Sequence, residues 1–312
     1  MGIARTCQRC CAVCERLGEA FMRCGGPVYV ALAGSLIVGI AYCFVNVILP
    51  LSVDYASAIG LLKAAAASFL MFNIMFNYVM SVRTDPGSPT ERDVQLACAE
   101  IGAGVRRFCE KCKCPKPLYT HHCAVCRRCV LKMDHHCPWV NNCVGHRNYR
   151  YFYNFLAWLW LGCLVICHAA YAAPELFRSP PGAKRVVRST TNGQRTTTAS
   201  QRSPSPFASD SQHSAAMFSV LIAFSIFIAM CLLWGWHVYL TFTAQTSIDY
   251  YEFSARRKAA RARGERWKNP HDNGWKRNFQ DAMDEHGRYW WFMWAMPRLR
   301  PHRGSGVFAA ID

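Results

Sequence analysis

Four long apolar segments alternate with polar segments along this chain of 312 residues. Three of them, residues 28–49, 151–173 and 215–242, carry no charged side chain, and residues 56–80 carry only Lys63 near one end. A helix needs about 20 residues to cross a hydrocarbon core of about 30 Å. Each segment is long enough, and four such segments do not fit the core of one soluble domain. The pattern predicts an all-α membrane protein with four transmembrane helices.

The polar segments set the predicted organisation. In order, we expect a cytosolic N-terminal segment (1–26), transmembrane helices 1 and 2 (27–80), a small cytosolic cysteine-rich domain (81–150), transmembrane helix 3 (151–173), a lumenal loop (174–214), transmembrane helix 4 (215–242) and a cytosolic C-terminal tail (243–312). The loop is rich in Ser, Thr, Pro, Gln and Arg, a composition that predicts disorder because it cannot bury a core.

The distribution of Lys and Arg predicts the orientation. Four precede the first apolar segment, twelve lie in residues 81–150, thirteen follow residue 242, six lie in residues 174–214 and none lies in residues 50–55. Basic residues are enriched on the cytosolic side of membrane proteins, so we expect both termini in the cytosol. The net charge of +17 suits anionic lipid headgroups and acidic ligands, and we expect a lipid bilayer but no nucleic acid among the partners.

Eight of the 18 cysteines lie between Cys109 and Cys143, together with four histidines. In a reducing compartment such a cluster indicates metal binding or catalysis, and disulfides are the weaker interpretation. The CxxC pairs have the spacing of zinc sites. Two closed tetrahedral sites need eight ligands, so the segment predicts two Zn²⁺ ions and leaves four candidate ligands over. A purely structural module has no need of a spare Cys beside a spare His.

Asp134-His135-His136-Cys137, within this cysteine-rich pattern, resembles the signature of the DHHC protein S-acyltransferases. The likeness extends to four spans and to Asp85-Pro86-Gly87 after the second span. In that family two structural zinc ions are held by interleaved Cys₃His sets. The resemblance implies Cys109, Cys112, His122 and Cys129 for the first ion, and Cys123, Cys126, His136 and Cys143 for the second.

The resemblance also implies the chemistry. Cys137 is expected to be the nucleophile, with His135 accepting its proton and Asp134 fixing the imidazole tautomer. A long acyl chain would pass from palmitoyl-CoA to Cys137 and then to cytosol-facing cysteines of membrane-associated proteins. The family implies the Golgi or the endoplasmic reticulum as location. Arg127, Arg128 and Lys132 are either contacts for the CoA phosphates or solvated surface residues.

The tail departs from the family pattern. Thr246-Ser247-Ile248-Asp249 stands where the family has Thr-Thr-x-Glu, and Tyr119 stands where it has Arg. We expect the hydroxyls and the acid to brace the cytosolic domain, and Asn278 to make a structural contact. The aromatic residues 289–294 predict either a helix at the membrane interface or a small subdomain that packs them internally.

Three other functions and one modification stay open. A zinc scaffold without activity would not need the complete Asp-His-His-Cys set. A RING-like ubiquitin ligase gives the leftover His and Cys no purpose, and a zinc transporter would need more intramembrane ligands than His168 and His237. Met1-Gly2 and the early cysteines Cys7, Cys10, Cys11 and Cys14 are compatible with lipid modification, with metal binding or with neither.

Overall fold

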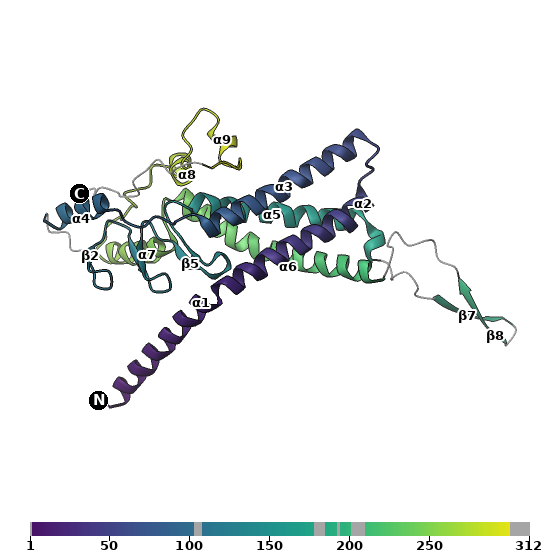
Figure 1. Ribbon diagram of the computed structural model, residues 1–312, viewed down its shortest axis with the longest axis horizontal. Coiled ribbons are helices and arrows are strands. Elements are labelled where there is room, and N and C mark those ends of the chain that lie inside the picture. Colours follow the sequence, from purple (N-terminus) through teal and green to yellow (C-terminus); the bar gives the residue numbers. More distant parts are fainter. Residues whose placement is uncertain (1, 103–107, 178–184, 192–193, 201–209, 300–312) are drawn as a thin grey trace. The chain divides into compact units, whose positions relative to one another are not determined.

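The structure, a computed structural model, describes residues 2–102, 108–177, 185–191, 194–200 and 210–299. Four helical segments in it are long and apolar enough to cross a membrane, which confirms the predicted four-span architecture (Figure 1). The first, Leu17–Leu51, comprises most of α1 (Gly2–Cys43), the π-helical η1 (Phe44–Ile48) and part of α2 (Leu49–Ser52). The other three are α3 (Ala58–Arg83), α5 (Tyr149–Ala172) and α6 (Asp210–Phe242). The chain is a multi-pass membrane protein.

The remaining elements are short. The segment between α3 and α5 contains α4 (Glu91–Gly102), β1 (Phe108–Cys109), β2 (Cys114–Pro115), β3 (His121–Cys123), β4 (Arg128–Val130), β5 (His135–Cys137), the 3₁₀ turn η2 (Pro138–Val140) and β6 (Asn142–Val144). After α5 come η3 (Pro174–Phe177), β7 (Arg185–Thr191) and β8 (Gln194–Ser200), and after α6 come α7 (Ser247–Ala262), α8 (Trp275–Met283) and α9 (Trp290–Met293). The strands pair as four antiparallel hairpins, β1–β2, β3–β4, β5–β6 and β7–β8.

The chain divides into two compact units. The first comprises Met1–Gly34, Asn73–Trp158 and Leu232–Asp312, and the second comprises Ser35–Phe72 and Leu159–Cys231. The core of the second unit is apolar and includes Phe44, Ile48, Leu176 and Ala223. The cysteine-rich hairpins, α7, α8 and α9 all belong to the first unit. That unit therefore contains every residue with predicted chemistry.

Helix α1 is longer than the predicted span. It begins at Gly2 and continues through Pro27, whereas the sequence predicted a polar segment up to residue 26. Part of this extension contacts the cysteine-rich domain, because the Arg23 guanidinium donates to the carbonyls of Val125 (3.1 Å) and Ala124 (3.3 Å). Cys14 is exposed. The side chains of Cys7, Cys10 and Cys11, and all of Met1, lie outside the described residues.

The loop between α5 and α6 differs from the sequence prediction. Composition predicted disorder for residues 174–214, but β7 and β8 form a regular antiparallel pair from Arg185↔Ser200 to Thr191↔Gln194 (Figure 1). The sequence carries the reason. Two runs rich in Val and Thr flank Asn192-Gly193, and an Asn-Gly dipeptide between β-branched runs is a strong hairpin signal. Residues 178–184 and 201–209 of the same loop lie outside the described part.

The tail combines both arrangements that the sequence left open. Trp290 and Trp294 pack against a buried cluster of Tyr153, Phe279 and Met283. On the same short segment the side chains of Tyr289, Trp291 and Phe292 are exposed. Because Tyr153 lies in the first turns of a membrane-spanning helix, the exposed aromatics lie close to the end of that span. Aromatic residues in this position favour the headgroup level.

Candidate active site and metal centres

The three hairpins of the cysteine-rich domain explain how two metal sites interleave. Side chains alternate between the two faces of a strand, so neighbouring residues point to opposite sides. In β3, His122 lies opposite Cys129 across the hairpin, while its neighbour Cys123 points the other way. In β5, His136 lies opposite Cys143. The β3–β4 and β5–β6 hairpins therefore each supply a His–Cys pair to one site, and the turn of the preceding hairpin supplies a CxxC pair to the same site.

The first cluster is formed by Cys109, Cys112, His122 and Cys129. The Nδ1 atom of His122 lies 3.5 Å from the Cys109 sulfur and 3.2 Å from the Cys112 sulfur. The sulfurs of Cys129 and Cys112 are 3.7 Å apart. The backbone N–H of Cys112 donates to the Cys109 sulfur (3.3 Å), as in a tight turn that aims two sulfurs at one point.

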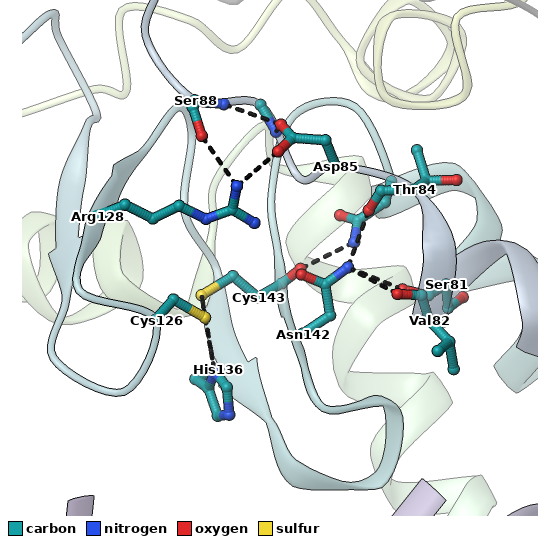
Figure 2. Close-up of polar contacts among 12 residues, drawn as sticks. Ser81, Val82, Thr84, Asp85, Ser88, Cys126, Arg128, His136, Asn142 and Cys143 are labelled. Atoms are coloured by element: carbon teal, nitrogen blue, oxygen red, sulfur yellow. Dashed lines mark hydrogen bonds and ion pairs between the residues drawn. The ribbon is translucent and has the colours of Figure 1, made fainter. Parts of the chain in front are cut away.

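The second cluster repeats this geometry with Cys123, Cys126, His136 and Cys143. The Nδ1 atom of His136 lies 3.8, 3.3 and 3.8 Å from the sulfurs of Cys123, Cys126 and Cys143. The sulfurs of Cys143 and Cys126 are 3.5 Å apart, and His136 lies beside them (Figure 2). The Cys126 N–H donates to the Cys123 sulfur (3.3 Å).

Both clusters fit a tetrahedral metal ion. With Zn–S distances of about 2.3 Å and Zn–N distances of about 2.0 Å, ideal tetrahedral geometry separates two sulfurs by about 3.8 Å and a sulfur from a nitrogen by about 3.5 Å. The observed sulfur–nitrogen separations of 3.2–3.8 Å and sulfur–sulfur separations of 3.5–3.7 Å lie close to these values. The two Cys/His clusters, whose ligands interleave along the sequence, can therefore each hold a metal ion. Cys114 and His121 belong to neither.

A repeat of fourteen residues relates the hairpins and singles out Cys137. Cys123 follows Cys109 by fourteen residues, and Cys137 follows Cys123 by the same number. The residue after each four-residue turn has a positive φ: 51° at Lys113, 54° at Arg127 and 46° at Asn141. At the second cysteine position of the third turn stands Val140, which is buried. The third turn thus has the shape of a metal-binding knuckle but only one sulfur, and Cys137 belongs to neither cluster.

The alternation within β5 also brings His135 and Cys137 to one face, away from His136. The Nδ1 atom of His135 lies 2.6 Å from Asp134 Oδ2, and the imidazole interacts electrostatically with the Cys137 sulfur. Asp134 and Cys137 are buried, whereas about a third of the His135 side chain is exposed. The arrangement is a carboxylate–imidazole–thiol chain in which solvent reaches only the middle group.

Helix α7 anchors the carboxylate of this chain. The backbone N–H of Ser247 donates to Asp134 Oδ1 (2.7 Å), and its hydroxyl donates to Asp134 Oδ2 (3.1 Å). Thr246 and Asp249 form a capping box at the start of the same helix and hold this N-terminus in place. Burial raises the pKa of Asp134, but the hydrogen bond and charge of His135 and the Ser247 amide outweigh it and lower that pKa below its usual value.

The pKa of the His135 imidazole is shifted in the opposite direction, upward. Burial lowers the pKa of His135, but its hydrogen bonds to Asp134 and Cys137 outweigh this and raise the pKa to about 9. His135 is therefore an imidazolium at neutral pH, with Asp134 ionised on one side.

The loop that carries Cys137 is held by α3. The Tyr78 hydroxyl lies 3.1 Å from the Trp139 carbonyl and 2.9 Å from the Val30 carbonyl of α1. The Asn142 amide donates to the carbonyls of Ser81 (3.2 Å), Val82 (3.3 Å) and Thr84 (2.8 Å), which lie at the C-terminal end of α3 (Figure 2). These contacts tie the loop of the nucleophile to the C-terminal part of α3, and Tyr78 in turn contacts α1.

The turn after α3 secures the middle hairpin. Asp85 Oδ1 accepts from the N–H groups of Gly87 (2.8 Å) and Ser88 (3.1 Å), and Gly87 adopts a φ of +106° that favours glycine. Asp85 Oδ2 receives the Arg128 guanidinium at 2.6 Å, and Arg128 also donates to the Ser88 hydroxyl (Figure 2). One of the three basic residues that were candidates for CoA contacts or for solvated surface is thus engaged in a structural ion pair.

The other two basic residues have different surroundings. Arg127 is exposed. Lys132 lines a cavity of about 240 Å³, together with Tyr119, Asp249, His271 and residues of α8. Asn278, the tail residue expected to make a structural contact, donates to the Phe242 carbonyl at the end of α6 (2.8 Å).

His237 is the site residue whose role the sequence did not reveal. It lies on α6, is almost fully buried, and has a ring nitrogen within 4.8 Å of donor atoms of Asp134 and His135. The available signal was a single imidazole within an uncharged span, since ionisable groups inside membrane segments are costly and usually functional.

Comparison with known proteins is consistent with this geometry. The family model for the DHHC palmitoyltransferase matches residues 103–254. The chain is 28% identical over 285 residues to Palmitoyltransferase ZDHHC16A of Danio rerio, which covers 83% of this chain and 72% of that protein. It is 33% identical over 241 residues to Palmitoyltransferase ZDHHC16 of Homo sapiens (75% of this chain, 61% of that protein). It is 31% identical over 259 residues to Probable protein S-acyltransferase 16 of Arabidopsis thaliana (80% and 81%). The match therefore spans about three to four fifths of these relatives.

Proposed function

Because the chain belongs to the DHHC palmitoyltransferase family of protein S-acyltransferases, we propose that Cys137 carries the transferred acyl group as a thioester, with His135 and Asp134 as its catalytic partners. One observation carries the proposal. Cys137 occupies the ligand position of a third knuckle that has no second cysteine, and it interacts electrostatically with an imidazole that Asp134 holds at 2.6 Å.

In the first half-reaction, the Cys137 thiolate attacks the carbonyl carbon of the acyl-CoA thioester. The C–S bond to CoA breaks, and the electron pair leaves on the CoA sulfur. His135, which holds the proton of the Cys137 thiol as an imidazolium, returns it to that sulfur. Asp134 keeps the imidazole in one tautomer and stabilises its positive charge. The products are the acyl-enzyme and free CoA.

In the second half-reaction, a substrate cysteine replaces CoA. His135 takes the proton of the substrate thiol, the substrate sulfur attacks the acyl carbonyl, and the bond to the Cys137 sulfur breaks. The proton then returns to Cys137. Because one thioester replaces another, the reaction is close to isoenergetic, and the site mainly supplies proximity and proton transfer.

We further propose that the two clusters hold structural Zn²⁺ ions. The donor sets are Cys₃His with tetrahedral spacing and leave no open coordination position, which is typical of structural zinc. Bound zinc would neutralise the thiolates and cross-link consecutive hairpins, and this fixes the turn that presents Cys137.

The membrane setting suggests donor, substrates and location. An acyl chain as long as palmitate is soluble among the spans while CoA stays in water. Cysteines of membrane-associated proteins that face the cytosol are the acceptors that reach this side. The excess of Lys and Arg in the cysteine-rich domain and at both termini supports a cytosolic position of these segments. The Golgi or the endoplasmic reticulum is the membrane that the family suggests.

The direct test is acylation of the purified, zinc-loaded protein with alkyne-tagged palmitoyl-CoA. We expect a hydroxylamine-sensitive label on wild type that Cys137→Ser abolishes while its two zinc ions remain. No label on the folded wild type would contradict the proposal and favour a scaffold without activity. A label that persists in Cys137→Ser would mark a different acceptor, such as the N-terminal cysteines.

A further inference from the structure

His237 is a buried imidazole that the proposed reaction does not use. It lies near the C-terminal end of α6 with about 1% of its surface exposed. An imidazole at this depth is costly to bury unless it has polar partners and a purpose. Its neighbours come from three elements: β5, α5 and the next turn of its own helix.

The first set of contacts reaches the catalytic pair. The ring centroids of His237 and His135 are 6.0 Å apart at an interplanar angle of 45°. Both rings pack edge-to-face against Phe152, at 5.3 Å for His237 and 5.4 Å for His135. The three rings form a closed triangle, and His237 and Phe152 are the two walls against which the His135 imidazole rests.

The second set of contacts fixes His237 itself. Its Nδ1 atom lies 3.3 Å from the Tyr149 hydroxyl, which in turn lies 2.9 Å from the Thr241 hydroxyl. Thr241 is one turn beyond His237 on α6, and Tyr149 is the first residue of α5. This hydrogen-bond chain sets the rotation of the His237 ring, which apolar packing alone would leave free.

The cluster of Asp134, His135 and His237 is not arranged as a third metal site. Their donor atoms lie within 4.8 Å of one another, but His135 Nδ1 and Asp134 Oδ2 are only 2.6 Å apart. Two ligands at about 2.0–2.2 Å from one ion are separated by well over 3 Å in tetrahedral geometry. The short separation is that of a charge-assisted hydrogen bond. Support of the imidazole is the role that remains.

We propose that His237 is a positioning residue that holds the His135 imidazole in line between Asp134 and Cys137. The inference rests on the proposed function of that pair. About a third of the His135 side chain is exposed, so the ring can tilt when a wall is removed. A displacement of about 1 Å at a reacting group can slow a reaction by about a hundredfold. Removal of His237 should therefore slow acyl transfer and leave the domain folded.

The test compares His237→Ala, which removes the wall, with His237→Phe, which keeps a ring but loses the bond to Tyr149. We measure the rate of acyl-enzyme formation against the concentration of palmitoyl-CoA, and zinc per chain. By the same positional argument, we expect kcat to fall about 10- to 100-fold for the Ala variant and about 3- to 10-fold for the Phe variant. KM should stay within about threefold and the zinc content at two ions, since His237 contacts neither cluster.

His213→Ala is the matched control. His213 is a buried histidine near the other end of the same helix, and its Nε2 is hydrogen-bonded to the Leu176 carbonyl (2.8 Å). If kcat fell equally in His237→Ala and His213→Ala, the inference would be overturned. The loss would then follow from removing any buried imidazole on α6, and not from the position of His237 beside His135. An unchanged kcat in both His237 variants would overturn it as well. Should the Ala variant lose zinc, the Phe variant decides alone.

A second measurement separates positioning from general stability. In a His135→Ala background, His237→Ala should leave the residual rate of acyl-enzyme formation unchanged, because the residue it positions is absent. A further drop in the double variant would show that His237 acts elsewhere and would refute the inference. Failure of the proposed function looks different: wild type itself would form no acyl-enzyme on Cys137.

Discussion

The hydroxyl of Ser247 offers the sharpest test of how the carboxylate is held. Ser247→Ala removes one of the hydrogen bonds to Asp134 (3.1 Å) and keeps the one from the backbone N–H (2.7 Å). A hydrogen bond to a charged group contributes about 1.5–3 kcal/mol, and the retained bond argues for the lower end. If that energy is lost in the transition state, acyl-enzyme formation should slow about tenfold, since 1.4 kcal/mol corresponds to about a factor of ten.

Ser247→Thr is the matched control, because it keeps the hydroxyl and restores the residue typical of the family. The assay is single-turnover labelling of Cys137 with palmitoyl-CoA at saturating concentration. We expect the Thr variant to react within about twofold of wild type, because the bond that contributes the 1.5 kcal/mol is retained. Equal rates for Ser247→Ala and wild type would refute the argument that the hydroxyl positions Asp134. Equal losses in both variants would point to packing instead of hydrogen bonding.

Three further predictions follow from the same geometry. Because Asp134 raises the pKa of His135 to about 9, the rate of acyl-enzyme formation should decline above about pH 9 in wild type. When the labelling rate is measured over a series of pH values, Asp134→Asn should move this alkaline limb of the profile to lower pH. Gly145→Ala should release zinc at lower chelator concentration than wild type. A Cβ at this position would lie 2.8 Å from a backbone carbonyl oxygen, and overpacking of this kind costs about 1–3 kcal/mol. Gly235→Ala is the control, because a Cβ there meets open space, and it should retain zinc as wild type does. Tyr78→Phe should slow labelling about five- to tenfold at unchanged zinc content, because the loss of one hydrogen bond of about 1 kcal/mol frees the loop of the nucleophile; an unchanged rate would show that the loop is held without it.

The sign of the pH prediction follows from the raised pKa. A histidine whose folded pKa exceeds its usual value of about 6.5 stabilises the protein most at low pH, and the contribution is lost as pH rises through the folded pKa. For His135 this window runs from about 6.5 to about 9. A limb that stayed at the same pH in Asp134→Asn would contradict the view that this carboxylate raises the pKa.

The spans and the CxxC turns were predictable because both are local. Residues 28–49 are apolar and uncharged whatever they pack against, and Cys109 and Cys112 meet through a four-residue turn. The assignment of His122 and His136 to different clusters came only from resemblance. The physical reason for that assignment is the alternation of side chains along β3 and β5. These strands are only three residues long, which is too short for a periodic pattern in the sequence to predict them.

Contacts between distant segments were not predictable from the sequence. Arg128 was expected near the acyl donor or in solvent, but it pairs with Asp85, 43 residues away. A brace from the Thr246–Asp249 segment was expected without a named partner, and the structure supplies it as Ser247 on Asp134, 113 residues away. His237 was considered only as a poor transporter ligand, since its position beside His135 depends on how α6 packs.

The hairpin in residues 185–200 shows a different limit. A composition argument averages over 41 residues and predicts disorder, whereas the Asn-Gly dipeptide acts on its immediate neighbours. The described strands β7 and β8 lie on the two runs of Val and Thr that flank this dipeptide.

A pulse-chase of the acyl-enzyme tests the central claim most directly. Wild type is labelled with tagged palmitoyl-CoA, the free donor is removed, and a cysteine peptide bound to vesicles is added. We predict that the label leaves Cys137 and appears on the peptide at the same rate and in equal amount, with no acyl-CoA present. A label that stays on Cys137 while peptide is acylated only in the presence of fresh donor would contradict the account, because acyl transfer would then bypass the proposed nucleophile.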